Sequence, residues 1–300
     1  MRALVFALTL GLTSVAMAQP GAPGDSINPP SAGQFWNRGE NRGFLAVSFD
    51  LGFLYLRPRL SAGWGKPHRF WVGIDANPIV QVSAAGSYVG LRFAHPNVNF
   101  RVGPRYGVAY NRSYLDPQDE FIERDYAIMD NSAASYLSWD AELTLSMEVG
   151  ELGELFSETS VVYISRVPAN RFVLEESIRV IVDPPWVWRQ RVGYAFRFGA
   201  ERAVSVGVTA EIIGVPKRDY AMLRGGLILR WHITPQLQVR GTFITALVSR
   251  DRVGNVNGQM GLLGLRWRWA TGMPTQLEET PEEGAEAAEE GDEPSIDEPR

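Results

Sequence analysis

Residues 135–149 read Ser135-Tyr-Leu-Ser-Trp-Asp-Ala-Glu-Leu-Thr-Leu-Ser-Met-Glu-Val149, and apolar and polar side chains alternate along this stretch without a break. Successive side chains of an extended chain point to opposite sides, so the pattern predicts a strand with one apolar and one polar face. Strands of soluble proteins are typically about five or six residues long, whereas a tilted transmembrane strand needs about 9–11. The length of this alternation therefore favours a strand that crosses a membrane.

The same alternation recurs at 98–110 and 186–198, and short polar turns such as His95-Pro96-Asn97 and Thr234-Pro235-Gln236 separate the candidate strands. No stretch shows a sustained apolar stripe of helical period, so the sequence predicts one all-β domain. We predict about twelve antiparallel strands, with ten as the alternative, at 44–56, 70–77, 86–94, 98–110, 135–149, 158–167, 172–182, 186–198, 203–215, 220–233, 237–249 and 257–270.

The long connection 111–134 conflicts with this list. If both chain ends lie in the periplasm, twelve strands in this order place 111–134 on the periplasmic side, where outer-membrane barrels have short turns. Either a strand is misdrawn, with 172–182 belonging to a loop and 44–64 containing an extra turn, or the barrel is unusual.

The polar faces of the predicted strands carry many charges in mid-strand. In a soluble periplasmic β-sandwich these charges would face water, and in a transmembrane β-barrel they would line an interior where both signs can pair. With Arg92, Asp50 and Asp75 included, the polar faces hold eleven arginines against six acids. The residues that we predict to line a lumen, as a pore or as a paired network, are Arg101, Arg105, Arg189, Arg191, Arg197, Arg224, Arg230, Arg240, Arg266, Arg268, Asp140, Glu142, Glu148 and Glu211.

Aromatic residues gather near the ends of the predicted strands, which is typical of the aromatic girdles of membrane barrels. They are Trp64, Trp71, Tyr88, Tyr106, Tyr110, Trp186, Trp188, Trp231, Trp267 and Trp269. Strand length, charged faces and aromatic positions together favour a barrel in the outer membrane of a Gram-negative envelope, surrounded by lipid.

The stretch Leu262-Leu-Gly264-Leu-Arg-Trp267-Arg-Trp269 resembles the terminal strand signal of bacterial outer-membrane β-barrel proteins, in which a glycine precedes two aromatic residues spaced by one position. The resemblance, carried by Gly264, Trp267 and Trp269, implies insertion by the barrel assembly machinery. Leu262 stands where a polar residue is usual, and the chain continues past Trp269 to residue 300.

The two ends of the chain differ in composition from the barrel at 44–270. Residues 1–18 resemble a secretory signal peptide, with Arg2, an apolar run and a final Ala16-Met17-Ala18, and 19–43 is a flexible segment rich in Pro and Gly. Residues 271–300 form an acidic tail that we predict to be disordered. The tail is either a solvated extension or an electrostatic contact for a basic periplasmic partner.

The sequence offers little catalytic chemistry. It has no cysteine, and its three histidines, His68, His95 and His232, have no metal-ligand spacing, so we predict neither metal nor cofactor. A barrel-embedded hydrolase would have to use His232 with Ser205 and Glu211. No phosphate-binding glycine motif is present, and nothing indicates nucleic-acid binding.

We therefore predict a narrow, anion-leaning pore for small solutes, because rings of positive charge favour anions. A closed structural or receptor-type barrel, and the hydrolase, are the alternatives.

Overall fold

The computed structural model describes residues 32–37, 40–52, 55–81, 83–110, 112–127, 132–150, 153–199, 202–253 and 263–273. The signal peptide predicted at 1–18 and most of the predicted acidic tail lie outside these ranges. The elements are α1 (Ala32–Asn37), β1 (Arg42–Gly52), β2 (Tyr55–Lys66), β3 (Phe70–Gln81), β4 (Ala84–Ala94), β5 (Val98–Tyr110), α2 (Glu123–Ala127), β6 (Ala133–Val149), β7 (Gly153–Ser165), β8 (Val173–Glu175), β9 (Val180–Val182), β10 (Trp186–Phe198), β11 (Val204–Val215), the 3-10 turn η2 (Pro216–Arg218), β12 (Tyr220–His232), β13 (Leu237–Val248) and β14 (Gly264–Ala270).

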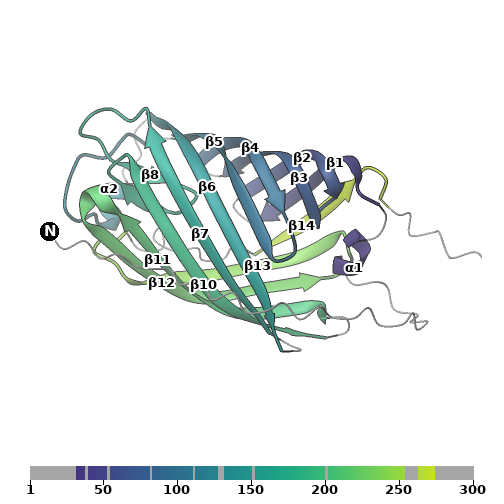
Figure 1. The fold of residues 1–300 in the computed structure, drawn as a ribbon. Coiled ribbons are helices and arrows are strands. Elements are labelled where there is room, and N and C mark those ends of the chain that lie inside the picture. Colours follow the sequence, from purple (N-terminus) through teal and green to yellow (C-terminus); the bar gives the residue numbers. More distant parts are fainter. Residues whose placement is uncertain are drawn as a thin grey trace, which may run out of the picture.

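Twelve strands form one closed antiparallel barrel in the order β1-β14-β13-β12-β11-β10-β7-β6-β5-β4-β3-β2 (Figure 1). The strands of the wall from β1 to β13 contain 11–17 residues, which is enough to cross a bilayer when tilted. The last strand, β14, has 7 residues and closes the barrel by pairing with β1 along its whole length. The all-β barrel predicted from the sequence is confirmed.

The predicted strand count is right, but two of the predicted strands are wrong. The range predicted as 44–56 contains most of β1 and the first two residues of β2, and the range 172–182 forms β8 and β9, a separate two-stranded sheet that is not part of the wall. The position of 111–134 had pointed to these same two ranges as one explanation of the conflict. The first range hides an additional strand and the second is not a wall strand, so the number of wall strands remains twelve. The connections from β5 to β6, from β7 to β10 and from β13 to β14 leave and re-enter the wall at one end of the barrel, which we call the loop end.

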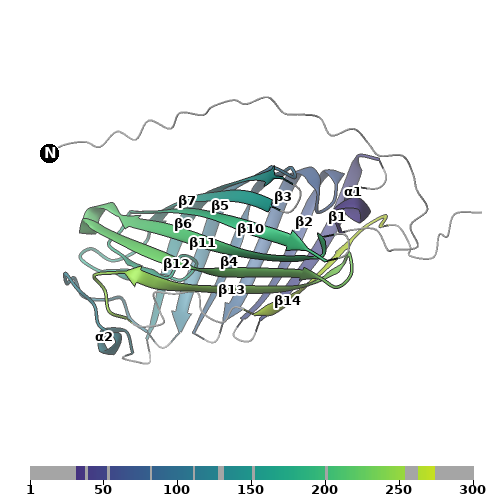
Figure 2. The same cartoon turned by 90° about the horizontal axis from the view of Figure 1, so that it is seen from below.

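The opposite end, which we call the termini end, holds the start of β1, the end of β14 and short turns such as 67–69 and 95–97. Figures 1 and 2 show α1 at this end and α2 at the loop end. Helix α1 lies within the segment 19–43, which the sequence predicted to be flexible. Within the described residues, no helix is both long enough and apolar enough to cross a membrane.

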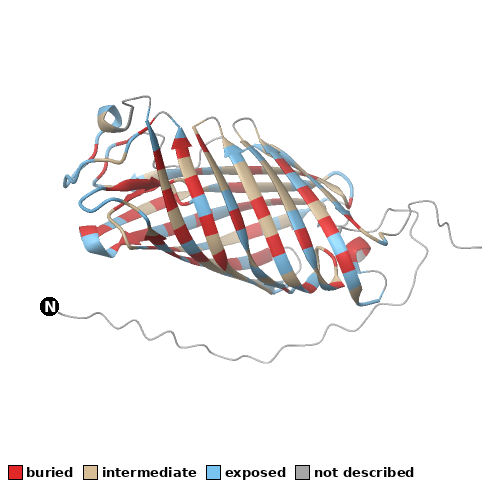
Figure 3. Cartoon of the chain, turned by 90° about the horizontal axis from the view of Figure 1, so that it is seen from above, coloured by how far each residue is buried: buried red, intermediate tan, exposed pale blue. Residues whose placement is uncertain are grey.

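Exposed and buried residues alternate along every strand of the wall, which gives the banded pattern in Figure 3. In 135–149, Trp139, Leu143 and Met147 are exposed, whereas Tyr136 and Ser138 are buried. Large apolar side chains thus face outward around the whole barrel and polar ones face inward. Such an apolar exterior suits contact with lipid acyl chains.

Outward-facing aromatic residues form a belt near each end of the barrel. Trp64, Trp231 and Trp269 lie toward the termini end, and Tyr110 and Trp186 lie toward the loop end. Two of the aromatics that the sequence assigned to these girdles, Trp71 and Tyr88, are instead buried inside the barrel. Each lies at an inward-facing position of its strand. Closeness to a strand end does not show whether a side chain points inward or outward.

An arginine on the outer wall is expected to be costly only where lipid surrounds it. Ile74, in the middle of β3, is 54% exposed, and Ile122, in the loop before α2, is 45% exposed. Ile74→Arg is expected to lower the free energy of unfolding by about 2–4 kcal/mol, the cost of an arginine at mid-bilayer, and Ile122→Arg to change it little. Unfolding in urea from lipid vesicles measures both, and equal effects would contradict a lipid-facing wall.

Candidate functional site: the charged lumen

The period of two places the predicted lumen residues on the inward faces of the wall. All ten arginines and the acids Asp140, Glu142 and Glu211 are buried or partly buried, while Glu148 lies at the rim of the termini end with its side chain 64% exposed. A closed wall with a continuous apolar exterior and an ionised interior is the arrangement by which strands cross a membrane. The fold is that of a transmembrane β-barrel.

No family model and no curated protein matches the sequence of this barrel. Among solved structures, an outer-membrane channel from Pseudomonas putida F1 aligns with a TM-score of 0.39 and 8% identity, over 82% of this chain and 99% of that chain. The KdgM porin in complex with disordered oligogalacturonate aligns with a TM-score of 0.38 and 8% identity, over 76% and 96%. The NanC porin aligns with a TM-score of 0.34 and 10% identity, over 76% and 98%.

One side of the lumen, which we call the balanced wall, is built mainly from β5, β6, β7, β10 and β11 and carries equal numbers of both charges. Its residues are Arg101, Arg105, Arg189, Arg191, Arg197 and Arg224 (from β12) with Asp140, Glu142, Glu148, Glu154, Glu158 and Glu211. Representative pairs are Arg101–Glu142 at 2.9 Å, Arg105–Asp140 at 2.6 Å and Arg197–Glu154 at 2.8 Å. At its centre, fully buried Glu211 contacts Arg191 at 2.6 Å and Arg224 at 3.0 Å.

The other side of the lumen, which we call the basic wall, runs from β12 through β13, β14, β1, β2 and β3 to β4. Apart from Arg42 at the rim of the termini end, which donates to the carbonyl oxygens of Thr271 and Gly272, it carries seven arginines and two acids, namely Arg57, Arg59, Arg92, Arg230, Arg240, Arg266 and Arg268 with Asp50 and Asp75. Asp50 pairs with Arg57 at 2.6 Å and with Arg266, and Asp75 pairs with Arg92 at 2.9 Å and Arg59 at 3.6 Å. Within the described ranges, Arg230, Arg240 and Arg268 have no carboxylate oxygen within 4.0 Å.

A hairpin folds into the lumen from the loop end. This lumen hairpin, 173–182, consists of β8, β9 and the turn between them. Its apolar side chains pack with inward-facing residues of the wall in one buried cluster, which includes Val173, Ile178, Val180 and Val182 of the hairpin and Tyr136, Val162, Ile164, Val187, Ile213, Val215, Tyr220 and Met222 of the wall. The sequence read this apolar run as a wall strand, because length and composition do not distinguish the two.

Buried polar contacts lock the lumen hairpin in place. Glu175, fully buried, accepts hydrogen bonds from Arg105, from the Tyr136 hydroxyl at 3.3 Å and from the Ile178 amide at 2.6 Å. Arg224 donates to the carbonyl oxygens of Ile178 at 2.7 Å and Arg179 at 2.6 Å. Burial raises the pKa of Glu175, but Arg105 and the hydrogen bonds outweigh burial and leave the pKa below its usual range.

A second layer of loops covers the lumen hairpin. Phe121, Phe172, Leu174, Ile181 and Val253 form a buried cluster that joins three separate connections. Beside the cluster, the buried guanidinium of Arg218 forms two hydrogen bonds of 2.8 Å with Asp251. The loop end is therefore closed in this structure by packed side chains and paired charges.

Helix α1 lies at the termini end and contacts inward-facing residues there. Phe35 and Trp36 are buried against Phe44, Trp71 and other inward-facing side chains of this end, and the Trp36 indole donates to the Pro235 carbonyl at 2.9 Å. The guanidinium of Arg268 lies 5.9 Å from the Trp36 ring. This helix narrows the lumen on the side of the basic wall.

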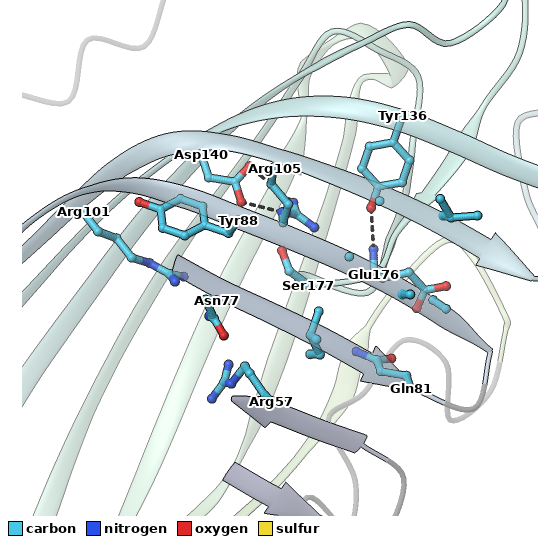
Figure 4. A pocket seen from close by; sticks show the side chains of 16 residues that line it. Arg57, Asn77, Gln81, Tyr88, Arg101, Arg105, Tyr136, Asp140, Glu176 and Ser177 are labelled. Atoms are coloured by element: carbon cyan, nitrogen blue, oxygen red, sulfur yellow. Dashed lines mark hydrogen bonds and ion pairs between the residues drawn. The ribbon is translucent and has the colours of Figure 1, made fainter. Parts of the chain in front are cut away.

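Cavities remain in the described part of the lumen. One, of about 80 Å³, is next to the lumen hairpin, and Figure 4 shows Arg57, Tyr88, Arg101 and Asp140 among the residues around it. Another, of about 280 Å³, extends to the turn 95–97 at the termini end. Because a water needs about 10–15 Å³ of such volume, both cavities are large enough for several waters.

The group that a barrel-embedded hydrolase would need is not assembled. Ser205 lies opposite Arg230, whereas Glu211 lies opposite Arg224, six residues further along β11, or about 20 Å at 3.4 Å per residue. His232 contacts Gln238 at 3.0 Å, and Glu211 is held by arginines. Ser205, Glu211 and His232 therefore cannot share the hydrogen bonds of a catalytic triad. Among the described residues, no three His, Asp or Glu side chains are grouped to hold a metal ion.

Sequence reasoning missed four charged residues of the wall and one of the hairpin. Arg57 and Arg59 alternate with Leu56 and Leu60, a signal hidden because 44–56 was drawn as one strand. Glu154 and Glu158 belong to β7, which begins earlier than the predicted 158–167. No sequence signal places Glu175 against Arg105, because this contact depends on the loop folding inward.

The terminal strand lies where the resemblance to assembly signals places it. Gly264 is the first residue of β14, and Trp267 and Trp269 point outward, opposite Phe49 and Val47 of β1. On its other side, β14 pairs with β13 only over Leu237–Arg240.

Proposed function

We propose that the barrel is an anion-selective channel of the outer membrane for small solutes, closed in this structure by the lumen hairpin. One observation carries the proposal: within the described lumen every acid has an arginine partner, whereas Arg230, Arg240 and Arg268 have no acid partner. Fixed positive charge that no protein group neutralises attracts mobile anions from water. A twelve-stranded barrel is wide enough for a narrow passage once the hairpin moves, since eight strands already enclose side chains alone.

Planar-bilayer recording in a salt gradient tests this function. Removal of the lumen hairpin, by replacing 173–182 with a short glycine-rich linker, is expected to give a steady conductance whose reversal potential shows anion preference. In that background, the combined substitution of Arg230, Arg240 and Arg268 by glutamine is expected to move the permeabilities toward equality. Arg197→Gln, which removes a paired arginine that shares Glu148 and Glu154, is the control. A hairpin-free barrel that stays silent, or that prefers cations, would reject the channel.

A closed structural or receptor-type barrel is the second candidate. The packing of the lumen hairpin and the Arg218–Asp251 pair at the loop end favours it, because both seal the mouth with buried contacts. The planar-bilayer recording distinguishes the two candidates, because a closed structural barrel conducts neither with the lumen hairpin nor without it.

We also propose how the barrel reaches the membrane. Residues 1–18 would be removed as a signal peptide after export, and Gly264, Trp267 and Trp269 would be recognised by the barrel assembly machinery. In outer-membrane barrels short turns face the periplasm and long loops face outward, which orients the termini end toward the periplasm. The acidic tail 271–300 would then be available there to a basic periplasmic partner.

A further inference from the structure

Two arginines lie directly opposite each other in the lumen without a carboxylate. Arg230 of β12 and Arg240 of β13 are register partners, and both point inward. The Cβ atoms of such partners are about 4.5–5.5 Å apart, and like charges in this position destabilise a sheet. Among the described residues neither guanidinium has an acid within 4.0 Å, so only the more distant carboxylates of Glu154, on the side of Arg230, and Asp50, on the side of Arg240, offset the repulsion.

A second arginine pair in the same barrel shows how the fold neutralises such a contact. Arg92 of β4 and Arg101 of β5 are also register partners. Each of them has its own acid, Asp75 at 2.9 Å for Arg92 and Glu142 at 2.9 Å for Arg101. The pair Arg230–Arg240 therefore lacks a negative group that its counterpart has.

Space for that group lies next to the pair. The cavity of about 280 Å³ is lined by both Arg230 and Arg240, and also by the neutral hydrogen-bonding side chains of Asn99, Thr144 and Thr242. Its two acids are already engaged, Glu154 by Arg197 at 2.8 Å and Glu158 by Arg189. The cavity thus presents two guanidiniums that have no carboxylate within 4.0 Å, together with neutral side chains that can hydrogen-bond an anion's oxygens.

We propose that Arg230 and Arg240 form a binding site for a doubly charged oxyanion, a phosphate group free or carried by a small organic molecule. Two adjacent guanidinium groups supply planar, paired donors that match the oxygens of phosphate, and two positive charges match a dianion better than chloride. The volume is near the lower limit of about 300 Å³ for ligand pockets, which suits a small solute. The site deepens the proposed function, since the same arginines contribute to anion preference, but its occupancy can be measured without any conduction.

Titration calorimetry on the refolded full-length barrel in detergent tests the site, with inorganic phosphate and glycerol phosphate as ligands at constant ionic strength in sodium chloride. Saturable binding of at least one ligand is expected, and the stronger of the two identifies the source of the phosphate group. Arg230→Gln and Arg240→Gln are each expected to weaken binding about tenfold or more, the value of a charge-assisted hydrogen bond. Arg268→Gln removes an equally unpaired charge elsewhere on the basic wall and is expected to leave affinity nearly unchanged.

A second readout separates a binding role from a merely structural one. Without phosphate, Arg230→Gln is expected to leave the barrel as stable as the parent or more stable, because it relieves like-charge repulsion. Phosphate is expected to raise the stability of the parent and not that of the variant. Equal weakening by all three substitutions, or no binding above that of chloride, would overturn the site. Binding in a barrel that never conducts would leave the site standing and reject only the channel.

Discussion

Glu211→Ala is expected to lower the free energy of unfolding by about 3–5 kcal/mol, the cost of leaving buried charges without their partner. Glu211 is fully buried and contacts Arg191 at 2.6 Å, Arg224 at 3.0 Å and Arg189 at 3.8 Å. Arg224 has no solvent exposure and would keep only the carbonyl oxygens of the lumen hairpin as partners. Tryptophan fluorescence during urea unfolding from lipid vesicles measures the loss.

Glu148→Ala is the matched control for this substitution. Glu148 also pairs with an arginine of β10, Arg197 at 2.8 Å, but its side chain is 64% exposed. Exposed ion pairs contribute about 0–1 kcal/mol, so the change is expected to be small. Losses of equal size at 211 and 148 would show that burial of the network does not determine its contribution.

Glu175→Gln is expected to release the lumen hairpin. The substitution removes the negative charge that Arg105 contacts on the hairpin, while Asp140 of the wall stays with Arg105 at 2.6 Å. The loss of this charge-assisted contact costs about 1.5–3 kcal/mol, which corresponds to a roughly tenfold to hundredfold smaller docked population. Channel openings in planar bilayers should become correspondingly more frequent, and protease should cleave 166–185 faster. A variant as silent and as resistant as the parent would show that apolar packing alone holds the hairpin.

Glu176, next to Glu175, provides a control whose substitution is expected to have the opposite effect on docking of the lumen hairpin. Burial raises the pKa of Glu176 above its usual range, although Arg112 lowers it, whereas the pKa of Glu175 is lowered. Ionised Glu175 therefore stabilises docking of the lumen hairpin when the pH is above the pKa that Glu175 has in the unfolded chain. This contribution is lost only when the pH falls through the lower pKa that Glu175 has in the folded barrel. Glu176 favours docking when protonated, and loses that contribution as pH rises through its raised folded pKa. Glu176→Gln is accordingly expected to tighten docking at neutral pH, and the parent hairpin to stay docked until the solution is strongly acidic.

The inward and outward faces of the strands could be predicted from the sequence. Each strand separates lipid from a charged interior, so apolar and polar residues must alternate along it. The phase of 135–149 and 186–198 was right for this reason. The partner of each charge could not be predicted in the same way. Pairing between neighbouring strands depends on strand register and on strand limits, so that Arg57 was missed because the predicted range ended at 56.

The lumen hairpin shows a different limit of sequence reasoning. Its strands, Val173–Glu175 and Val180–Val182, are as apolar as a membrane strand, but their exposure to lipid or to a packed interior is decided by the fold. The position of 111–134 was the one sequence feature that indicated the error, because it constrains how many strands precede a long loop. The topological argument showed that the strand list was inconsistent, and the structure identifies 172–182 as a misassigned range.

The unequal charge of the two walls gives the interior an electric field that points across the barrel axis, from the side of β12 to β4 toward β5 to β11. A solute with separated charges that enters this space would be turned, with its negative end toward the seven arginines. Orientation, and not charge alone, would then distinguish molecules of the same size in their passage.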